Sequence, residues 1–378
     1  MKKLIDATTT PLASIFGSGF LVIVPILAAA VGPYAVYAMA GVTLLAYAVG
    51  SVIRFNIRHA EPLLAADNAP HLTTFFERGS DLALVGAYVV SVSLYLNILS
   101  SFLLGGLDHV WPGIDSNLTE HLVTVTVIAA IGLIGYTKGL ELLQELEDIA
   151  LWITLLIIVA VFIGFGAYDL RAMQGAGIQW PTIPHESWWQ ILTILGGTLI
   201  VVQGFETSRY LGQEFDADTR IRSSRLSQIV STVVYLVFIA LATPLMHFLG
   251  GKAETNSLIM LAGIASVLLP LPLVAAAVLS QFSAAVADTM GGGGNMVEVT
   301  KQHITAKCAY LIIAGGAIIL AFAPTLTILA LASRAFAFYY MLQCLVAITV
   351  SKNRLQRIAI GAVAAVLALI TIFAVPAG

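Results

Sequence analysis

The stretch from residue 15 to residue 25 reads IFGSGFLVIVP, and it interrupts an apolar run long enough to cross a bilayer. Glycine at positions 17 and 19 lowers helix stability, and Pro25 lacks a backbone hydrogen-bond donor. Irregular backbone at membrane depth is tolerated only where it is buried in protein or lines a polar cavity. The pattern therefore predicts either a broken first membrane helix or a point where small residues let two helices pack closely.

A second interruption lies at residues 201–208, which read VVQGFETS. It follows a long apolar run that begins near Trp188, so a glutamine, a glycine and a carboxylate stand at membrane depth. A carboxylate such as Glu206 is costly there unless it is paired, protonated or solvated by a cavity. Alternatively the span ends at Gly204 and Glu206 lies in the interface, but the apolar face continues through residues 210–215 and favours a break.

The composition predicts a membrane protein with several helical spans. Of 378 residues, 59% are hydrophobic and only 10% are charged, whereas soluble proteins carry roughly 25% charged residues. So few charges could not cover the surface of a soluble domain of this size. The longest connections between apolar runs, at 55–80, 168–187 and 292–305, are too short to bury a core of their own.

Apolar runs of about 20 residues predict about eleven transmembrane helices, since that length crosses a bilayer. The expected spans are 11–31, 34–54, 81–106, 119–137, 142–167, 188–212, 224–249, 270–291, 306–322, 325–350 and 355–375. The short apolar run at 256–268 precedes Pro270 and predicts a surface or re-entrant helix instead.

The placement of positive charge predicts the orientation. Nearly all of the 18 lysines and arginines fall in segments on the same side as the N-terminus, and the exceptions are Arg171, Lys252 and Arg334. Cytoplasmic loops carry such an excess of lysine and arginine. We therefore expect a multi-pass protein of the cytoplasmic (inner) cell membrane, with its N-terminus in the cytoplasm and its C-terminus outside.

The two interrupted spans are the first and the sixth. Broken helices at corresponding positions of two halves are typical of transporters built from inverted repeats. A repeat of five spans is odd, so the second repeat enters the membrane in the opposite sense. We predict an all-α fold with discontinuous helices 1 and 6, in which residues 1–170 and 171–350 form a 5+5 inverted repeat and residues 351–378 add one C-terminal helix.

The two motifs together resemble signatures of the amino acid–polyamine–organocation (APC) superfamily, whose members share the LeuT-type 5+5 inverted-repeat fold. Gly17-Ser18-Gly19 through Pro25 resembles the G-S-G-x-x-x-x-x-P pattern of the first span in that family. The run from Gly204 to Glu206, with Glu214 downstream, resembles the break of its sixth span. The order of helices extends the resemblance over spans 1–10, but the chain is short for the family and lacks a twelfth span.

The resemblance implies that substrate binds between the two breaks. Backbone N–H groups of Ser18 and Gly19 would bind a substrate carboxylate, because the end of a broken helix attracts anions. Carbonyls of residues 201–204 would accept from a substrate ammonium, and Phe205 would form a gate or pocket wall. The residues predicted to bind substrate are Gly17, Ser18, Gly19, Phe20, Val202, Gln203, Gly204, Phe205, Glu206, Asn97 and Arg334.

Two of these residues have structural alternatives. Asn97 lies on span 3 beside other polar residues, Ser91, Tyr95 and Ser101, for which hydrogen bonding between helices is the alternative. Arg334 is the basic residue predicted at membrane depth in span 10. We predict that Arg334 forms part of an external gate, contacts an anionic substrate group, or pairs with an acidic or carbonyl partner.

A coupling ion is predicted on span 8. In sodium-coupled relatives this helix supplies hydroxyls to a cation that first-span carbonyls also bind, and Ser283 with Ser280 or Ala284 resembles that pattern. Serines that bond to carbonyls of their own helix are the alternative. Asp288, one turn further on, is a candidate ion-exit or proton-relay carboxylate. The residues predicted to form the ion path are Phe16, Gly19, Ser280, Ser283, Ala284 and Asp288.

Some proton-coupled members carry a lysine on span 5, and residues 151–167 contain none. This favours sodium over protons or exchange, although Glu206 and Asp288 are usable proton carriers. The seven histidines show no metal-ligand spacing, and the glycines at 291–294 precede no phosphate-loop lysine. We expect no enzyme activity, and no cofactor other than a sodium ion as the coupling ion.

We therefore expect an ion-coupled secondary active transporter, driven by sodium or protons, that moves an amino acid or amine by alternating access. The alternatives are transport of an inorganic ion, a nucleobase or another metabolite on the same fold, a membrane sensor without transport, and a channel. The predicted partners are a small-molecule substrate and the lipid bilayer, and no nucleic acid.

Overall fold

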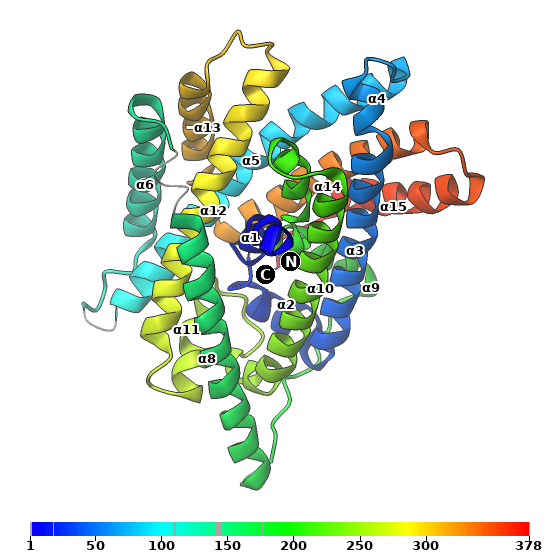
Figure 1. Ribbon diagram of the computed structural model, residues 1–378. Coiled ribbons are helices and arrows are strands. Elements are labelled where there is room, and N and C mark those ends of the chain that lie inside the picture. Colours follow the sequence, from blue (N-terminus) through cyan, green and yellow to red (C-terminus); the bar gives the residue numbers. More distant parts are fainter. Residues whose placement is uncertain (1, 18, 109–110, 141–145, 176, 378) are drawn as a thin grey trace.

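The computed structural model describes residues 2–17, 19–108, 111–140, 146–175 and 177–377. Within these ranges all regular secondary structure is helical, and there is no strand (Figure 1). Among the described residues, eight helices are long and apolar enough to cross a membrane, and Ala306–Leu320 is a shorter apolar helix. The prediction of an all-α, multi-pass membrane protein is confirmed at this level.

The helical elements follow the order of the predicted spans. They are α1 (Lys2–Gly17), α2 (Ile23–Val31), η1 (Gly32–Tyr34), α3 (Ala35–His59), α4 (Glu61–Ala65), α5 (His71–Leu107), α6 (Asn117–Thr137), α8 (Leu146–Gln174), α9 (Trp188–Gly196), η2 (Leu199–Val202), η3 (Phe205–Gln213), α10 (Ala217–Ala242), η4 (Thr243–Leu249), α11 (Ser257–Ala265), α12 (Pro270–Val299), α13 (Ala306–Leu320), α14 (Thr325–Val350) and α15 (Arg354–Phe373).

Several helices begin earlier than the predicted spans. The third span was expected at 81–106, but α5 begins at His71, directly after Pro70. Hydropathy marks only the apolar part of a helix. Helix α5 also contains the polar residues that precede its apolar part, and it starts directly after a proline. The capping residue Asp216 sets the start of α10, where the backbone N–H and hydroxyl of Thr219 hold the pKa of that carboxyl below its ordinary value.

The predicted interruption of the first span is present. Helix α1 ends at Gly17 and α2 begins at Ile23, so Pro25 lies in the first turn of a new helix, where its missing N–H costs little. Between them Gly19 has a φ of +141°, a conformation that residues with a Cβ rarely adopt. The backbone therefore leaves the helix at the Gly-Ser-Gly motif.

The sixth span is interrupted over a longer stretch. Helix α9 ends at Gly196, and the short 3-10 helix η2 leads to Gln203, whose backbone is extended. Gly204 follows with a φ of +125°, and η3 begins at Phe205. The glutamine and glycine that marked the break in the sequence are the residues at which the helix is lost.

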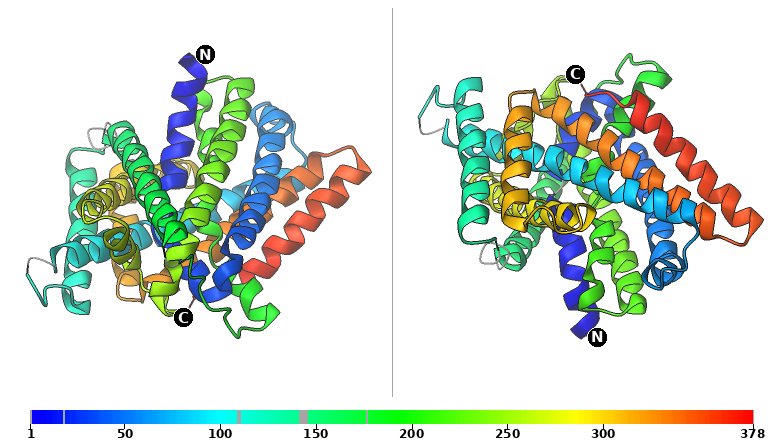
Figure 2. Two further views of the ribbon diagram at one scale, coloured as in Figure 1. Left: turned by 90° about the horizontal axis from the view of Figure 1, so that it is seen from below. Right: turned by 90° about the horizontal axis from the view of Figure 1, so that it is seen from above.

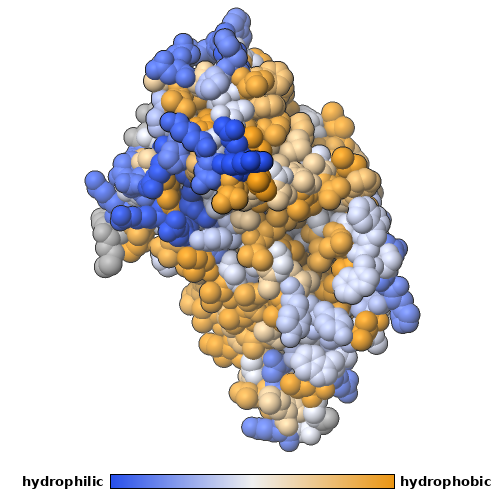
Figure 3. Space-filling model, turned by 90° about the vertical axis from the view of Figure 1, so that its right-hand side faces the viewer, coloured by the Kyte–Doolittle hydropathy of each residue, from blue (hydrophilic) through white to orange (hydrophobic). Residues whose placement is uncertain are grey.

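Helix α5 forms the centre of the bundle, where it packs against both α12 and α14. In the most apolar 18-residue stretch of α5, 78% is buried inside the protein, compared with 17% in the corresponding stretch of α15. Helices α6 and α15 lie at opposite edges of the molecule, and α1 lies between them (Figure 2). The face that carries α3 and α15 shows a broad apolar surface with a large hydrophilic group at one end and smaller ones toward the other, as expected for a surface that meets lipid (Figure 3).

A buried group of ion pairs fastens η3 to its neighbours. We call it the Arg209 network, and it comprises Arg209, Glu61 of α4, Glu77 of α5 and Arg220 of α10. Arg209 pairs with Glu77 and lies 3.6 Å from Glu61. Arg220 donates to Glu61 at 2.7 Å and to the backbone oxygen of Arg209 at 2.8 Å. Ion pairs and hydrogen bonds thus hold η3, which follows the break at Gly204, to three other elements.

We expect Arg209→Ala to destabilise the protein strongly. The Arg209 and Glu77 side chains are only 9% and 13% exposed, so the substitution leaves the Glu77 carboxylate without a counter-charge, which typically costs about 3–5 kcal/mol. Arg58→Ala is the matched control, because the Arg58 and Asp218 side chains are 56% and 70% exposed and such pairs contribute about 0–1 kcal/mol. Thermal unfolding of both variants in detergent tests this; equal losses of stability would contradict it.

Candidate functional site

The two helix breaks lie against each other. A Cβ placed on Gly19 would stand 2.9 Å from Cγ2 of Val201, and one placed on Gly204 would stand 2.6 Å from the hydroxyl of Ser14 and 2.7 Å from the backbone nitrogen of Ile15. All three distances are shorter than real Cβ contacts. The approach of the two backbones therefore requires glycine at both breaks.

Tyr235 of α10 joins the carbonyls of both interrupted helices. It is fully buried, and its hydroxyl oxygen lies 2.6 Å from the Val201 oxygen and 3.2 Å from the Ile15 oxygen. A phenol hydroxyl has one proton, so it donates to the nearer carbonyl of Val201. The sequence analysis missed Tyr235; a tyrosine in the apolar run of the seventh span was the available signal.

Gln281 of α12 satisfies the end of α1. Its side-chain nitrogen donates to the Gly17 oxygen at 2.8 Å, and a Cβ on Gly17 would lie 2.8 Å from that of Ala284. The end of α1 is therefore fixed to α12 by a hydrogen bond and by close packing. The side-chain oxygen of Gln281 is buried, and no described residue donates to it. This amide at membrane depth, next to Ser280, was also missed.

Glu206 lies within the sixth-span break and is fully buried. Its Oε2 accepts from the backbone N–H of Gly204 at 2.9 Å and from the hydroxyl of Tyr340 at 2.7 Å. The neighbouring Phe205 stacks on the ring of Tyr340, with centroids 5.3 Å apart. No described residue donates to Oε1 of Glu206. The carboxylate thus links the break to α14 by hydrogen bonds, and its other oxygen can accept from a further donor.

Hydrogen bonds between different elements involve four of the polar residues named in the sequence analysis. Gln203 donates from its side-chain nitrogen to the hydroxyl of Tyr95 at 3.0 Å, and Ser91 donates to the carboxylate of Asp288. The alternative given for the polar residues of span 3 is therefore correct for Ser91 and Tyr95. Asp288 of α12 and Gln203 of the break both contact α5 through these bonds.

The hydrogen bonds that Asn97 and Arg334 make do not connect either residue to the breaks. Asn97 donates to the oxygen of Ser93 at 2.8 Å, one turn back on its own helix. Arg334 is half-buried and donates to the oxygens of Thr371 and Ile372 at 2.7 and 3.1 Å. These carbonyls belong to the last turn of α15, where a cation is stabilising. Arg334 therefore pairs with carbonyl oxygens, which is one of the alternatives predicted for it.

A cavity of about 10 Å³ lies beside the predicted ion path, close to the smallest space that holds one water molecule. Phe16, Phe20, Thr154 and Ser280 are among its lining residues, and most of the others are aliphatic. The hydroxyl of Thr154 is buried and has no partner among the described residues, whereas Ser280 donates to the oxygen one turn back at 3.3 Å.

The remaining predicted residues are placed as follows. Ser283 is buried on α12 but is not among the residues that line this cavity. Val202 and Phe20 are buried at the two breaks. Ser18, predicted to bind a substrate carboxylate, lies outside the described residues.

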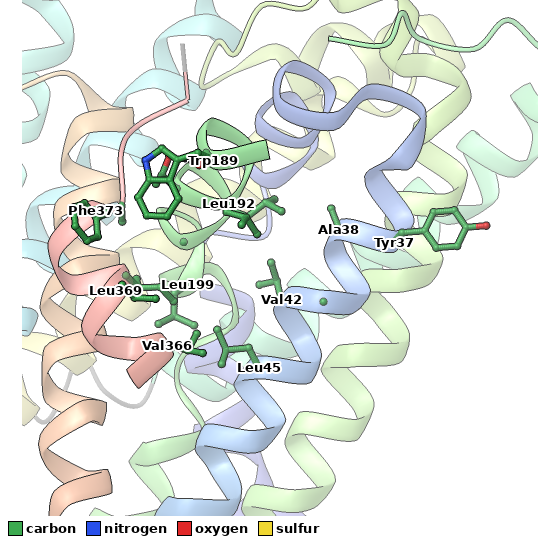
Figure 4. A pocket seen from close by; sticks show the side chains of 16 residues that line it. Tyr37, Ala38, Val42, Leu45, Trp189, Leu192, Leu199, Val366, Leu369 and Phe373 are labelled. Carbon is green, nitrogen blue, oxygen red and sulfur yellow. Dashed lines mark hydrogen bonds between the residues drawn. The ribbon is translucent and has the colours of Figure 1, made fainter. Parts of the chain in front are cut away.

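A larger pocket of about 500 Å³ lies between α3, α9 and α15 (Figure 4). Leu192, Leu199, Val42 and Val366 point into it, whereas Tyr37 is turned away. Its lining is almost entirely aliphatic and aromatic, so it offers nothing that would neutralise both charges of a zwitterion. The two breaks, with their polar groups, are the better candidate for a substrate site.

The chain is similar to several known proteins. A family model described as an APC superfamily transporter matches residues 1–375. An uncharacterized protein of Aquifex aeolicus (strain VF5) is 38% identical over 381 residues, which cover 98% of this chain and 91% of the relative. A crystal structure of a mutant manganese transporter from Eremococcus coleocola aligns with a TM-score of 0.57 and 13% identity over 98% of this chain and 86% of that chain; at this identity the match shows a shared fold.

We expect Gly204→Ala to disrupt the site. The added methyl would meet Ser14 and Ile15 at less than contact distance, and φ at this position is +125°. Strain of this kind costs about 1–3 kcal/mol. Gly315→Ala is the control, since that glycine lies in α13 with no atom within 4 Å of the added carbon. Thermal unfolding is the measurement, and unchanged stability in Gly204→Ala would show that the breaks do not need this close contact.

Proposed function

This chain belongs to the APC superfamily of transporters, and we propose that it is an ion-coupled secondary active transporter that moves an amino acid or amine by alternating access. The observation that carries the proposal is the pair of helix breaks in contact, with a buried carboxylate between them and α14. Broken helices offer backbone donors at one end and carbonyl acceptors at the other, which suits a molecule with opposite charges.

Glu206 is the proposed contact for a positively charged group. The Gly204 N–H and the Tyr340 hydroxyl both donate to its Oε2, while Oε1 is buried and accepts no hydrogen bond from any described residue. An unpartnered buried carboxylate oxygen is costly, and a substrate ammonium or a proton would remove that cost. Backbone N–H groups of the first break, at Gly19 and its neighbours, are proposed to bind the carboxylate of the same substrate.

We propose the 5+5 inverted repeat as the frame for this site. Helices α1 and α2 would form span 1, and α9, η2 and η3 would form span 6, so that the chain has eleven spans in all. Residues 1–170 and 171–350 are the proposed repeats, and α15 is the appended helix. The excess of lysine and arginine on one side supports an N-terminus in the cytoplasm and a C-terminus outside.

The anchoring of the sixth span supports alternating access. Its inner half, η3, is held by the Arg209 network. Its outer half, α9, accepts a hydrogen bond at the Thr193 oxygen from the Val375 N–H at 3.2 Å. The extended Gln203 and the glycine at 204 separate the two halves. Because each half is attached to different elements, one can tilt while the other stays in place.

The coupling ion is proposed to be sodium or a proton. For sodium, the support is the water-sized cavity that Thr154 and Ser280 line beside the end of α1. For a proton, the support is the buried carboxylate of Glu206. Transport of an inorganic cation is the second candidate; among the described residues there is no group of three or more metal-binding side chains, which favours an organic substrate.

A ligand screen tests the proposal directly. Amino acids, amines, nucleobases and manganese chloride are each added to purified protein with and without sodium chloride, and thermal unfolding is followed. A ligand that binds the folded state raises its apparent stability by mass action. We expect stabilisation by an amino acid or amine. Stabilisation by manganese or a nucleobase alone would replace the proposed substrate, and a requirement for sodium would identify the coupling ion.

The role of Glu206 is tested with Glu206→Gln. Glutamine keeps an oxygen for Gly204 and Tyr340 but removes the charge, so affinity for the ligand found in the screen should fall about tenfold or more, the effect of one charge-assisted hydrogen bond. Glu186→Gln is the control, because that residue is exposed in the segment before α9. An unchanged affinity in Glu206→Gln would remove this carboxylate from the proposed site.

A further inference from the structure

Arg54 of α3 is a buried cation without an acidic partner. Only 6% of the residue is exposed. Its Nη1 donates to the side-chain oxygen of Gln228 on α10 and lies 3.5 Å from the hydroxyl of Ser224. Its Nη2 lies 3.5 Å from the backbone oxygen of Tyr47. These acceptors are all neutral, and none of the salt bridges between described residues involves Arg54.

The surroundings of this guanidinium are held in place by contacts of their own. Gln228 donates from its side-chain nitrogen to the Ala46 oxygen at 2.7 Å, and its amide lies against Gly50, where a Cβ would stand 2.2 Å from the side-chain oxygen. The guanidinium lies over the ring of Tyr47, with Cζ 4.8 Å from the ring centroid. A guanidinium has five N–H donors, so these contacts leave some of them for a further acceptor.

The uncompensated charge sets this arginine apart. Arg58, Arg209 and Arg220 each pair with a carboxylate. Arg54 instead has a second cation nearby, since the charge of Arg225 on α10 acts on it. A buried arginine without a counter-charge is costly inside a membrane. An anion bound beside Arg54 would remove that cost.

Arg54 lies at the level where the exposed surface of α3 and α10 changes from apolar to basic. Helix α10 packs along α3. On one side of this level the exposed residues of the two helices are apolar, and on the other side they include arginines. The apolar ones are Leu44, Tyr47, Ile229 and Val233, and the basic ones are Arg58, Arg222 and Arg225. A molecule that carries both an anionic group and hydrocarbon chains matches this surface, whereas a free anion matches only its basic part.

We propose that Arg54 binds the phosphate group of an anionic membrane lipid, whose acyl chains lie along the exposed apolar residues of α3 and α10. A planar guanidinium donates parallel N–H groups to phosphate oxygens. Basic pockets between membrane helices bind such headgroups on the cytoplasmic side, and the orientation proposed above places this end of α3 there. The site is separate from the two breaks, so the inference goes beyond the proposed transport function.

The test is native mass spectrometry of the full chain after delipidation, titrated with phosphatidylglycerol and, separately, with phosphatidylcholine of the same acyl chains. Phosphatidylcholine carries the same phosphate together with a cation, which Arg225 would repel. We expect the wild type to bind phosphatidylglycerol about tenfold more tightly, the effect of one charge-assisted hydrogen bond. In Arg54→Gln the two affinities should differ by about twofold or less, because only exposed charges, which act weakly, remain.

Two further variants make the result specific to this position. Ser224→Asp keeps Arg54 and its bond to Gln228 but places a carboxylate next to the guanidinium, so the preference for phosphatidylglycerol should also be lost. It serves as the test should Arg54→Gln fail to fold. Arg354→Gln is the control: it removes an exposed arginine at the start of α15, and the wild-type preference should remain.

Each outcome decides the proposal. A wild type without preference, or a preference that persists in Arg54→Gln or in Ser224→Asp, overturns it. An equal loss in Arg354→Gln assigns the preference to general surface charge and overturns it as well. If inorganic phosphate at equal concentration displaces phosphatidylglycerol, the acyl chains contribute nothing and the assignment to a lipid fails. None of these results depends on the ligand screen, so the lipid site and the proposed transport function can fail independently.

Discussion

A helix that is broken inside a membrane exposes backbone groups that lipid cannot hydrogen-bond. Much of this structure can be understood as an answer to that constraint. Tyr235 donates to Val201, Gln281 donates to Gly17, and Glu206 accepts from the N–H of Gly204. Each partner comes from a buried position, so the breaks persist because surrounding side chains replace the bonds that a continuous helix would have made.

The same substitution of side chains for helix bonds leaves some polar atoms available. The oxygens Oε1 of Glu206 and Oε1 of Gln281 are buried at the breaks, and no described residue donates to either. A site that satisfied every group would have nothing to offer a ligand. The large apolar pocket beside α9 illustrates the contrast: it has volume but lacks polar groups, whereas the breaks have polar groups in a closely packed setting.

The sequence predicted the positions of the breaks because glycine and proline act locally on the backbone. It also predicted their polar character, since Gln203 and Glu206 stand in an apolar run. It did not predict the partners. Tyr235 and Gln281 lie on spans other than the two interrupted ones, and hydropathy does not tell which face of a helix meets which neighbour. The Arg209 network was missed for the same reason, because its members appear in the sequence as separate charges near the ends of spans.

The close contact of the two breaks has a consequence for how such a chain can change over evolution. Gly19 faces Val201, and Gly204 faces Ser14 and Ile15, so each break forms part of the surroundings of the other. A larger residue at one break needs compensation from a segment almost two hundred positions away. The glycines of the two motifs should therefore be inherited together with their partners, and an exchange of one half between related chains would join surfaces that were never selected to fit.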